Sequence, residues 1–434
     1  MKLKPARRIG GQLSLPGDKS ISHRAALIAA LATGVSHLSN FSTSRDCAST
    51  LACLRQLGVE ITRDGNTWIV KGGEGLVASS APLDCGNSGS TIRMLAGILA
   101  SRDFKSELTG DESLRSRPMQ RIIEPLEQMG AQIDSREGKP PITIHGSRDL
   151  RPIRYPLPVA SAQVKSCILF AGLGTTGHTE VIETTSTRDH TERLFNAFGV
   201  SVRTELEESG RRVVSLEGPA EFTAGKISIP GDISSAAYFV AAAMLLPGSQ
   251  LALEGVSLNP TRAEFLSVLR SWGASITTTD IQTECNEPVG TVLVTSSVDG
   301  PLGRDQNRRL AEAMIPLLID ELPLLAIVGT QISGGLEIRN ARELRVKETD
   351  RLAATVQNLR AMGADVEEYE DGLAVAGPTR LRGALIDSYG DHRIAMAFAI
   401  AALIAEGASE ITGEECVEIS FPEFFQLLET VVER

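Results

Sequence analysis

Apolar and polar positions along the chain repeat one local pattern. A short stretch with helical spacing ends at a glycine, and residues that alternate between apolar and polar follow at once. Glycine tolerates the left-handed conformation that ends many helices, and alternation is typical of a half-buried strand, so each stretch predicts a helix–glycine–strand junction. The pattern is present at Leu54–Thr62, Leu126–Asp134, Phe195–Arg203, Leu269–Thr277 and Leu359–Glu367.

The spacing of these junctions predicts a repeated architecture. Their glycines lie 69 to 90 residues apart, and a unit of about 70 residues fits about six times into the 434 residues of the chain. A sixth helix is expected over Phe421–Val432, where too little chain remains for a following strand. The junction glycines are Gly58, Gly130, Gly199, Gly273 and Gly363.

The chain also contains a repeat with a longer period. The segment Leu15–Leu31 resembles Ile229–Leu245, and both contain Pro-Gly-Asp followed by a helix rich in small residues. In each copy the Pro-Gly pair predicts a turn, and the aspartate predicts an N-cap for a buried helix. The two copies begin 214 residues apart, which is about three units, so the chain divides into two similar halves of three units each.

The two Pro-Gly-Asp copies differ in their charged residues. The first carries Lys19, Ser20 and Arg24, whereas the second has Ile233 and small residues at and near the matching places. A turn and a cap need none of these cations, so the second copy acts as an internal control. Because a helix N-terminus with nearby Lys and Arg suits phosphate or carboxylate, the first copy is a candidate anion site.

Four further segments of the first half carry candidate chemistry. A Gly-rich turn over Cys85–Arg93 could hold an anion on its backbone amides, although a simple helix cap would have the same sequence. Arginines in Thr109–Arg121 could belong to the site or to a solvated loop. Ser161–Lys165 places polar groups at a helix start. Ser186–Glu192 mixes charges, but a single histidine with one glutamate makes a poor metal site.

The second half has three candidates. Within Arg345–Arg351, Lys347 and Arg351 would share one face of a helix at i, i+4, which favours an anion between them over a surface ladder of ion pairs. Arg393 begins an apolar helix. Asp320 lies inside an apolar stretch, where a carboxylate has a raised pKa and can act as an acid or base, unless the segment is only a loop.

Composition narrows the classes of function. Hydrophobic residues make up 42% of the chain and charged residues 22%, as in globular proteins. The net charge of −11 argues against a nucleic-acid binder. The six cysteines include no CxxC pair, no run of 18 apolar residues is present, and the N-terminal segment has no secretory pattern. These features predict a cytoplasmic protein without a membrane partner.

Taken together, the motifs resemble those of EPSP synthases in the enolpyruvyl transferase family. The strings LPGDKSISHR, GNSGSTIR, RSRP, SAQVK, TRDHTE, IDELP, RVKETDR and GDHR occur here in the family's order. The resemblance implies an α/β fold of two domains, each with three βαβαββ repeats around a pseudo-threefold axis, in an inside-out α/β barrel. It places domain I at residues 1–17 plus 231–434 and domain II at residues 18–230, with the active site in the cleft between them.

The resemblance also implies a reaction and a set of site residues. An enolpyruvyl group would pass from phosphoenolpyruvate to the 5-hydroxyl of shikimate 3-phosphate in the shikimate pathway, in a monomer that needs no metal or organic cofactor. Asp320, Glu348 and Lys19 would be catalytic. Shikimate 3-phosphate would bind Lys19, Ser20, Arg24, Ser161, Gln163, Arg188, Asp320 and Lys347. Phosphoenolpyruvate would bind Lys19, Asn87, Gly89, Arg117, Gln163, Arg351 and Arg393.

The chain departs from the family pattern at several positions. Many relatives have Thr in place of Ser90, Pro in place of Met94 and Ser in place of Ala162. Some carry a lysine just before the final Phe-Pro, which this chain lacks, and Lys165 is a candidate to replace that contact. Gly89 is where added bulk would crowd glyphosate, the family's inhibitor, so its presence predicts a glyphosate target.

Two other functions remain open from the sequence. A UDP-N-acetylglucosamine enolpyruvyl transferase would share the fold, but such enzymes usually have a reactive cysteine after the Gly-rich turn, and residues 86–121 contain none. In this chain Lys19 is also followed by Ser and not by Asn. A catalytically silent anion-binding relative would lack Lys19, Asp320 or Glu348, and all three are present.

Overall fold

The computed structural model describes residues 1–296 and 309–434, and the chain divides into two compact units. Unit 1 comprises Met1–Pro16, Pro230–Gln282 and Pro288–Arg434, and unit 2 comprises Gly17–Ile229 and Thr283–Glu287. The chain passes between units at both Pro-Gly-Asp turns, one residue from the divisions that the sequence suggests. The grouping of Thr283–Glu287 with unit 2 was not expected from the sequence. Each unit has its own hydrophobic core.

Unit 2 contains three four-stranded sheets that share one strand order. In each sheet an edge strand pairs parallel with its neighbour, and two antiparallel pairings follow. In sheet order the strands are β14 (Lys226–Ser228), β3 (Gly34–Ser39), β5 (Thr67–Gly72) and β4 (Glu60–Asp64); β6 (Leu83–Asp84), β7 (Lys105–Thr109), β9 (Lys139–His145) and β8 (Gln132–Arg136); and β10 (Arg154–Pro156), β11 (Gly177–Glu183), β13 (Arg212–Gly218) and β12 (Val202–Leu206).

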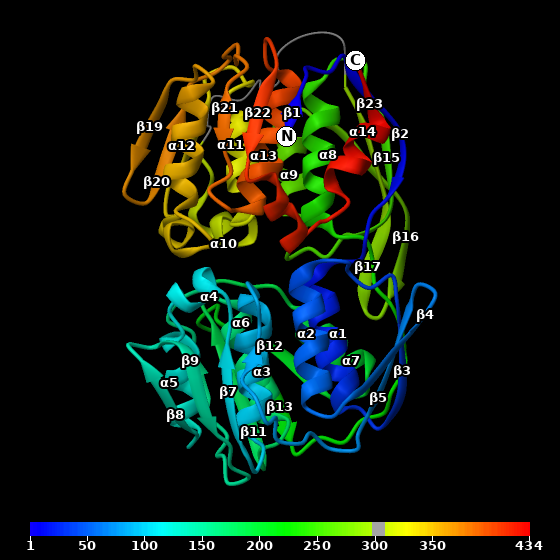
Figure 1. Cartoon of the computed structure of the whole chain (residues 1–434), viewed down its shortest axis with the longest axis vertical. Coiled ribbons are helices and arrows are strands. Elements are labelled where there is room, and N and C mark those ends of the chain that lie inside the picture. The colour runs from blue at the N-terminus through cyan, green and yellow to red at the C-terminus, as the bar shows by residue number, and fades with distance from the viewer. Residues whose placement is uncertain (297–308) are drawn as a thin grey trace. The chain divides into compact units, whose positions relative to one another are not determined.

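Three long helices of unit 2, α1, α3 and α6, lie inside its sheets (Figure 1). Helices α1, α3 and α6 are buried over most of their length, whereas the strands alternate between buried and exposed positions. This arrangement agrees with the predicted three-repeat α/β unit that has its helices inside. The helices are α1 (Lys19–Leu31), α2 (Arg45–Gln56), α3 (Gly89–Ala100), α4 (Glu112–Ser116), α5 (Gln120–Gln128), α6 (Ala162–Gly172) and α7 (His190–Ala197).

Unit 1 follows a related plan. Its sheets contain, in order, β16 (Ser275–Glu284), β17 (Glu287–Thr295), β15 (Gln250–Ser257), β2 (Arg8–Ser14) and β23 (Val432–Glu433); β18 (Leu336–Ile338), β20 (Gly372–Val375) and β19 (Val366–Tyr369); and β1 (Lys2–Leu3), β22 (Ser409–Thr412) and β21 (Leu385–Asp387). A parallel bridge between Arg309 and Glu337 stands at the edge of the second sheet, where unit 2 has a parallel strand.

The helices of unit 1 include α8, α11 and α13, which are buried along all or almost all of their length. Their apolar residues contribute to the single core of this unit. The α-helices are α8 (Ile233–Leu245), α9 (Glu264–Ser271), α10 (Ile315–Leu318), α11 (Leu322–Gly329), α12 (Arg351–Ala361), α13 (His392–Ile404) and α14 (Phe424–Val431), and the 3₁₀ helices are η1 (Glu312–Met314), η2 (Arg342–Val346) and η3 (Glu414–Ile419).

Each unit completes a sheet with a strand from the other half of the sequence. Strand β2 directly precedes α1 in the chain, yet it pairs in parallel with β15 of unit 1. Strand β14 directly precedes α8, yet it pairs in parallel with β3 of unit 2. The Pro-Gly-Asp turns that follow these two strands are therefore the points where the chain leaves one unit for the other. At both turns the aspartate caps the next helix, as predicted.

The predicted helix–glycine–strand junctions are confirmed at all five positions. Each junction glycine lies just past a helix and has a φ between +84° and +99°, in the region that disfavours residues with a Cβ. The strands that follow are β4, β8, β12, β16 and β19. The prediction that the last helix has no strand was wrong, because the short strand β23 follows α14 and pairs with β2.

Helices α3 and α6 approach each other closely at Gly97. A Cβ at this position would lie 2.1 Å from the backbone oxygen of Cys167 on α6. No side chain fits at that distance unless one of the two backbones moves. Because α3 begins at Gly89 and α6 at Ala162, this contact fixes the relative positions of two helix starts that carry candidate site residues.

A chain of buried hydrogen bonds links α1, α2 and α3. Nδ1 of His23 lies 2.7 Å from Oγ1 of Thr50, which lies 2.7 Å from Oγ1 of Thr91. The Thr91 hydroxyl donates to Oγ of Ser88 at 2.8 Å, so the one Thr50 hydroxyl proton goes to Thr91. His23 must then carry its proton on Nδ1. Ser88 is the N-cap of α3, so this chain fixes the start of that helix.

Replacing Gly97 by alanine should destabilise unit 2 by about 3 kcal/mol, because the added Cβ separates α3 from α6. The matched control is Gly199→Ala, where the added Cβ meets open space and only the positive φ opposes it. That control should cost about 1 kcal/mol. Urea denaturation of both variants measures the two values, and equal losses would contradict the close approach of the two helices.

Burial lowers the pKa of His23 well below its usual value, and the charges of Lys19 and Arg24 lower it further. In the unfolded chain this histidine gains a proton as the pH falls below about 6.5, whereas in the folded chain it stays neutral. Its contribution to stability is thus complete above that pH and is lost as the pH falls toward the folded pKa, at up to about 1.4 kcal/mol per pH unit.

Urea denaturation of the wild type and of His23→Asn at several pH values tests this expectation. The wild type should lose stability more steeply than the variant between about pH 6.5 and pH 5, because only the wild type has this titrating group. Parallel curves for the two proteins would show that His23 is not held neutral.

Candidate functional site

Several predicted site residues of unit 2 lie at the starts of three buried helices. Helix α1 begins at Lys19, α3 begins at Gly89, and α6 begins one residue before Gln163. Each start has a side-chain cap, and Ser161 is the cap of α6, with its Oγ accepting from the backbone of Val164. Because first-turn N–H groups and the helix dipole favour negative charge, these helix starts suit an anionic ligand.

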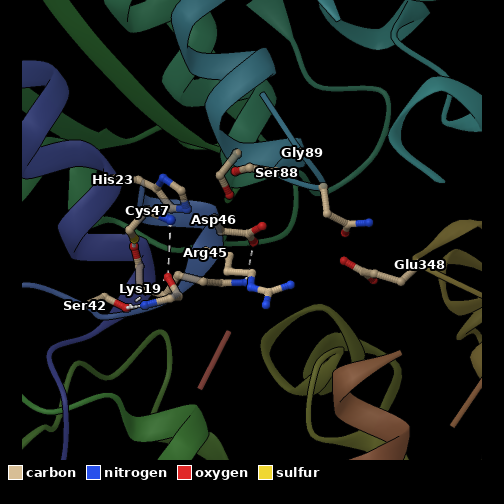
Figure 2. Close-up of polar contacts among 12 residues, drawn as sticks. Lys19, His23, Ser42, Arg45, Asp46, Cys47, Ser88, Gly89 and Glu348 are labelled. Carbon is tan, nitrogen blue, oxygen red and sulfur yellow. Dashed lines mark hydrogen bonds and ion pairs between the residues drawn. The ribbon is translucent and has the colours of Figure 1, made fainter. Parts of the chain in front are cut away.

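Lys19 is held by a carboxylate that the sequence analysis did not single out. Its Nζ lies 2.9 Å from Oδ2 of Asp46, and Figure 2 shows the two side chains turned toward each other. Asp46 is buried, in the first turn of α2, and the Lys19 side chain is 17% exposed. This ion pair fixes the direction of an ammonium group that stays accessible to solvent.

Arg24 is a buried cation that contacts only neutral acceptors. Its Nε donates to Oγ1 of Thr191 at 2.7 Å, and its Nη2 donates to Oγ of Ser166 at 3.0 Å. Its Nη1 donates to the backbone oxygen of Ser20 at 2.9 Å. No carboxylate in residues 1–296 or 309–434 forms an ion pair with this guanidinium, which is 2% exposed.

The surroundings of Arg24 disfavour the protonated form of its side chain. Burial, together with the like charge of Arg188, lowers the pKa of Arg24 to about 10, and Glu192 acts in the opposite direction. A guanidinium is costly to bury without an anion, since the group loses its water and gains no opposite charge. The region around Arg24 and the half-buried Arg188 is therefore electrostatically prepared for a negatively charged ligand.

Gln163 of α6 is hydrogen-bonded to two residues in the first part of α3, beside the Gly-rich turn. Its Oε1 accepts from Nη1 of Arg93 at 2.6 Å, and its Nε2 donates to Oγ of Ser90 at 2.9 Å. Arg93 lies near Gly89, because a Cβ built on that glycine would be 2.7 Å from Nη1 of Arg93. The sequence analysis did not place Arg93 in the site, although it belongs to the Gly-rich motif.

Arg117 and Asn87 form the other side of this turn. Nη2 of Arg117 donates to Oδ1 of Asn87 at 2.7 Å, and Nδ2 of Asn87 donates to Oδ2 of Asp111 at 2.8 Å. Arg117 is 6% exposed, so the alternative that it lies in a solvated loop was wrong. The two predicted residues thus lie together, and Asp111 is a partner that the sequence did not identify.

Arg351 joins the predicted carboxylates of unit 1. Its Nη2 lies 2.6 Å from Oε2 of Glu348, and its Nη1 lies 3.3 Å from Oδ1 of Asp320. Its Nε donates to Oδ2 of Asp391 at 2.7 Å. Burial opposes the charge of this guanidinium, yet Asp391, Glu348 and Asp320 together raise the pKa of Arg351 above its usual value. Asp391 also caps α13 and was missed in the sequence.

Asp320 faces cations, which corrects the apolar setting that the sequence suggested. It lies in the turn between α10 and α11, and its Oδ2 is 3.7 Å from Nη2 of Arg393. Arg393 also approaches Glu321, with Nη1 and Oε1 3.6 Å apart. Although burial opposes its charge, Asp320, Tyr238 and Glu321 raise the pKa of Arg393. Most of the apolar residues around Asp320 belong to α10 and α11, and the carboxylate itself faces two guanidinium groups.

The prediction that Lys347 and Arg351 share a helix face was wrong. Helix α12 begins at Arg351, because the Asp350 side chain caps it by accepting from the backbone of Ala353. Lys347 lies before this cap, and its Nζ is 3.8 Å from Oε1 of Glu343. Burial lowers the pKa of Lys347, although nearby carboxylates oppose this shift.

Lys165 is not available as a replacement for the missing C-terminal lysine. Its side chain is 0% exposed, and its Nζ lies 3.0 Å from Oε1 of Glu183 and 2.7 Å from Oε1 of Glu192. A lysine with two buried carboxylate partners cannot also reach a ligand in solvent without breaking both ion pairs. The proposal that Lys165 contacts phosphoenolpyruvate is therefore wrong.

The residues that sequence reasoning missed are mainly partners of predicted ones. Asp46, Asp111 and Asp391 each hold a predicted cation or amide, but they lie 24 to 40 residues from it along the chain. No spacing rule links residues so far apart. Arg93 had a usable signal, because it lies one helical turn after Gly89 and must share its face of α3.

The described part of the chain offers neither a metal site nor a membrane-spanning helix. In the described part of the chain, no three or more His, Cys, Asp or Glu side chains gather in a way that could hold a metal ion. His190 has a carboxylate partner, with Nδ1 2.7 Å from Oε1 of Glu287. Nor do residues 1–296 and 309–434 include a helix that is long and apolar enough to span a membrane.

Comparison with known proteins places this geometry in a family. A sequence model described as EPSP synthase (3-phosphoshikimate 1-carboxyvinyltransferase) matches residues 3–428. The 3-phosphoshikimate 1-carboxyvinyltransferase of Koribacter versatilis is 51% identical over 436 residues, which cover 100% of this chain and 99% of the relative. The enzyme of the same name from Salinibacter ruber is 49% identical, with 98% of each chain covered.

A solved structure agrees with these sequence matches. EPSP synthase from Acinetobacter baumannii superposes with a TM-score of 0.86 at 38% sequence identity, covering 99% of this chain and 98% of that one. The fold and nearly the whole length are therefore shared. The chain belongs to the EPSP synthase (3-phosphoshikimate 1-carboxyvinyltransferase) family.

Proposed function

We propose that this chain transfers the enolpyruvyl group of phosphoenolpyruvate to the 5-hydroxyl of shikimate 3-phosphate and releases inorganic phosphate. Membership of the EPSP synthase family supports the reaction. The structural observation that carries the proposal is the buried guanidinium of Arg24, which has neutral acceptors only among the described residues. Such a group favours a permanently anionic substrate, as shikimate 3-phosphate is.

The acceptor substrate would bind mainly through unit 2. In this proposal Lys19, Ser20 and Arg24 hold shikimate 3-phosphate from α1. Ser161 and Gln163 contribute from the start of α6, and Arg188 from the loop before α7. Unit 1 would add Asp320 and Lys347. The lowered pKa of Lys347 supports this role, because an ammonium that is costly to desolvate gains from an anionic ligand.

Phosphoenolpyruvate, the donor substrate, would bind arginines of both units. Phosphoenolpyruvate would contact Arg117, Asn87 and Gly89 at the Gly-rich turn, together with Lys19 and Gln163. Arg351 and Arg393 would bind it from unit 1. Arg351 has three carboxylate partners, so an anionic ligand would share its N–H groups with them. We propose that the two sets of residues form one active site, between the two domains, when both substrates are bound to a monomer.

The proposed chemistry is an addition followed by an elimination. Asp320 takes the proton of the 5-hydroxyl while the hydroxyl oxygen forms a bond to C2 of phosphoenolpyruvate. In the same step Glu348 gives a proton to C3. The product of this step is a tetrahedral adduct with a methyl group. In the second step C3 returns a proton to Glu348 and the C2–C3 double bond forms again. The bond between C2 and the phosphate oxygen breaks, and the departing phosphate takes the proton held by Asp320. Lys19 and the arginines stabilise the negative charge of the departing phosphate.

Phosphate release from phosphoenolpyruvate tests the proposed reaction. Release should require shikimate 3-phosphate and should not occur with UDP-N-acetylglucosamine, the acceptor of the sister enzymes. Asp320→Asn keeps the size of the side chain but cannot accept the proton, so kcat should fall by about a hundredfold or more.

Asp371→Asn is the matched control, because Asp371 pairs with Arg339 in the same unit and has no proposed role. Its kcat should stay near the wild-type value. Turnover with the nucleotide sugar alone would move the protein to the sister reaction. Absence of turnover with either acceptor, in a folded protein that binds anions, would indicate a silent relative.

Glyphosate should inhibit the wild type, and Gly89→Ala should be less sensitive. The new Cβ would lie 2.7 Å from Nη1 of Arg93 and 3.4 Å from Nη1 of Arg117, so it would crowd Arg117, which is proposed to bind phosphoenolpyruvate, and its neighbour Arg93. We expect the inhibition constant to rise about tenfold or more, equivalent to about 1.4 kcal/mol. Gly130→Ala, where the added Cβ meets open space, is the control. Equal inhibition of all three proteins would refute the placement of the inhibitor.

A further inference from the structure

Lys165, which the sequence suggested as a ligand contact, has a different place in the structure. It lies in the second turn of α6 and is enclosed by Glu183 at the end of β11 and Glu192 in the first turn of α7. We propose that Lys165 is a positioning residue that holds the start of α7 and thereby sets the Arg24 site for shikimate 3-phosphate. This inference rests on the proposed function.

The three side chains form a buried ionic cluster, and Arg212 lies at its edge, with Nε 4.0 Å from Oε2 of Glu183. Nζ of Lys165 is 3.0 Å from Oε1 of Glu183 and 2.7 Å from Oε1 of Glu192, and each side chain is at most 5% exposed. Ion pairs shielded from water are screened much less than surface pairs, and removal of one partner leaves an uncompensated buried charge. The ammonium therefore holds together two carboxylates that would otherwise repel each other.

A second contact between the same two helices runs beside this cluster and reaches Arg24. Ser166 follows Lys165 on α6, Thr191 precedes Glu192 on α7, and the two hydroxyl oxygens are 2.6 Å apart. Both of these hydroxyls accept hydrogen bonds from the Arg24 guanidinium. If Glu192 moved away from α6, Thr191 would move with it, and Arg24 would lose an acceptor that fixes its orientation.

The other carboxylate of the cluster anchors the loop before α7. Oε1 of Glu183 accepts from the backbone nitrogen of Thr187 at 3.2 Å and also from its hydroxyl. Thr187 precedes Arg188, the second arginine proposed to bind shikimate 3-phosphate. Lys165 is thus linked to both arginines, to Arg24 through Glu192 and to Arg188 through Glu183.

One carboxylate of the cluster also acts on Arg24. Glu192 raises the pKa of Arg24, against the effect of burial. Glu183 is shared between Lys165 and Arg212, whose Nε lies 4.0 Å from Oε2 of Glu183. Glu192 thus supplies negative charge near Arg24 without a carboxylate on the guanidinium N–H groups, which remain suited to a ligand.

The test measures shikimate 3-phosphate binding by calorimetry, and both Michaelis constants, for a set of full-length variants. Lys165→Met removes the ammonium and keeps most of its volume. We expect the Kd for shikimate 3-phosphate to rise about tenfold, the coupling expected within one hydrogen-bonded network, with a matching rise in its KM. The KM for phosphoenolpyruvate should change much less, because no group proposed to bind it touches the cluster.

A double variant separates positioning from loss of packing. Lys165→Met leaves Glu192 facing Glu183, whereas Lys165→Met with Glu192→Gln removes that repulsion. The second change should recover at least about threefold of the lost affinity, and Lys165→Arg should recover more. Cys167→Ala is the matched control, since it is a buried α6 residue outside the cluster. It should lower the melting temperature without changing the Kd.

Arg24→Met separates failure of this inference from failure of the proposed function. If Arg24→Met weakens binding while Lys165→Met, once folded, binds as the wild type does, the positioning role is wrong and the proposed site stands. If Arg24→Met binds normally, the proposed site itself is wrong. Should Lys165→Met not fold, Thr191→Val tests the same link, because it removes the acceptor of Arg24 and leaves the cluster intact. Unchanged binding by Thr191→Val would then overturn the inference.

Discussion

A guanidinium buried without a carboxylate partner is the constraint on which the rest of this structure depends. Arg24 is held by Ser166, Thr191 and a backbone oxygen, all of them neutral. Such a group is stable only if the surrounding fold fixes it firmly and supplies negative charge at a small distance. Helices α1, α6 and α7 provide the acceptors, and Glu192, which Lys165 holds in place, provides a nearby negative charge. The fold of unit 2 thereby keeps the Arg24 guanidinium in place beside neutral acceptors.

Unit 1 has a related architecture, but its buried arginines are paired with carboxylates. There the cations Arg351 and Arg393 are surrounded by carboxylates, and the charges largely neutralise each other. A carboxylate that must take up a proton and an acid that must give one need defined positions, which ion pairs with fixed guanidinium groups supply. We therefore propose that one repeated α/β plan carries mainly binding residues in unit 2 and the proton-transfer residues Asp320 and Glu348 in unit 1.

Local features of the fold could be predicted from the sequence, and distant pairings could not. The junction glycines and the aspartate caps depend on residues within one turn, so the local sequence is enough to predict them. The contrast between the two Pro-Gly-Asp copies pointed to Lys19 and Arg24 for the same reason. The burial of Lys165 and the pairing of Arg351 with Asp391 depend on helices brought together by the whole fold. Asp320 shows the limit most clearly, because its neighbours in sequence are apolar, whereas its contacts in the fold are Arg351 and Arg393.

The most direct test of this account is a crystal structure with shikimate 3-phosphate bound. We predict that an anionic group of the ligand accepts hydrogen bonds from Arg24, with Lys19 and Ser20 beside it, and that Ser166 and Thr191 keep their contacts with the guanidinium. The account would be contradicted if the ligand bound elsewhere and Arg24 kept only its neutral acceptors.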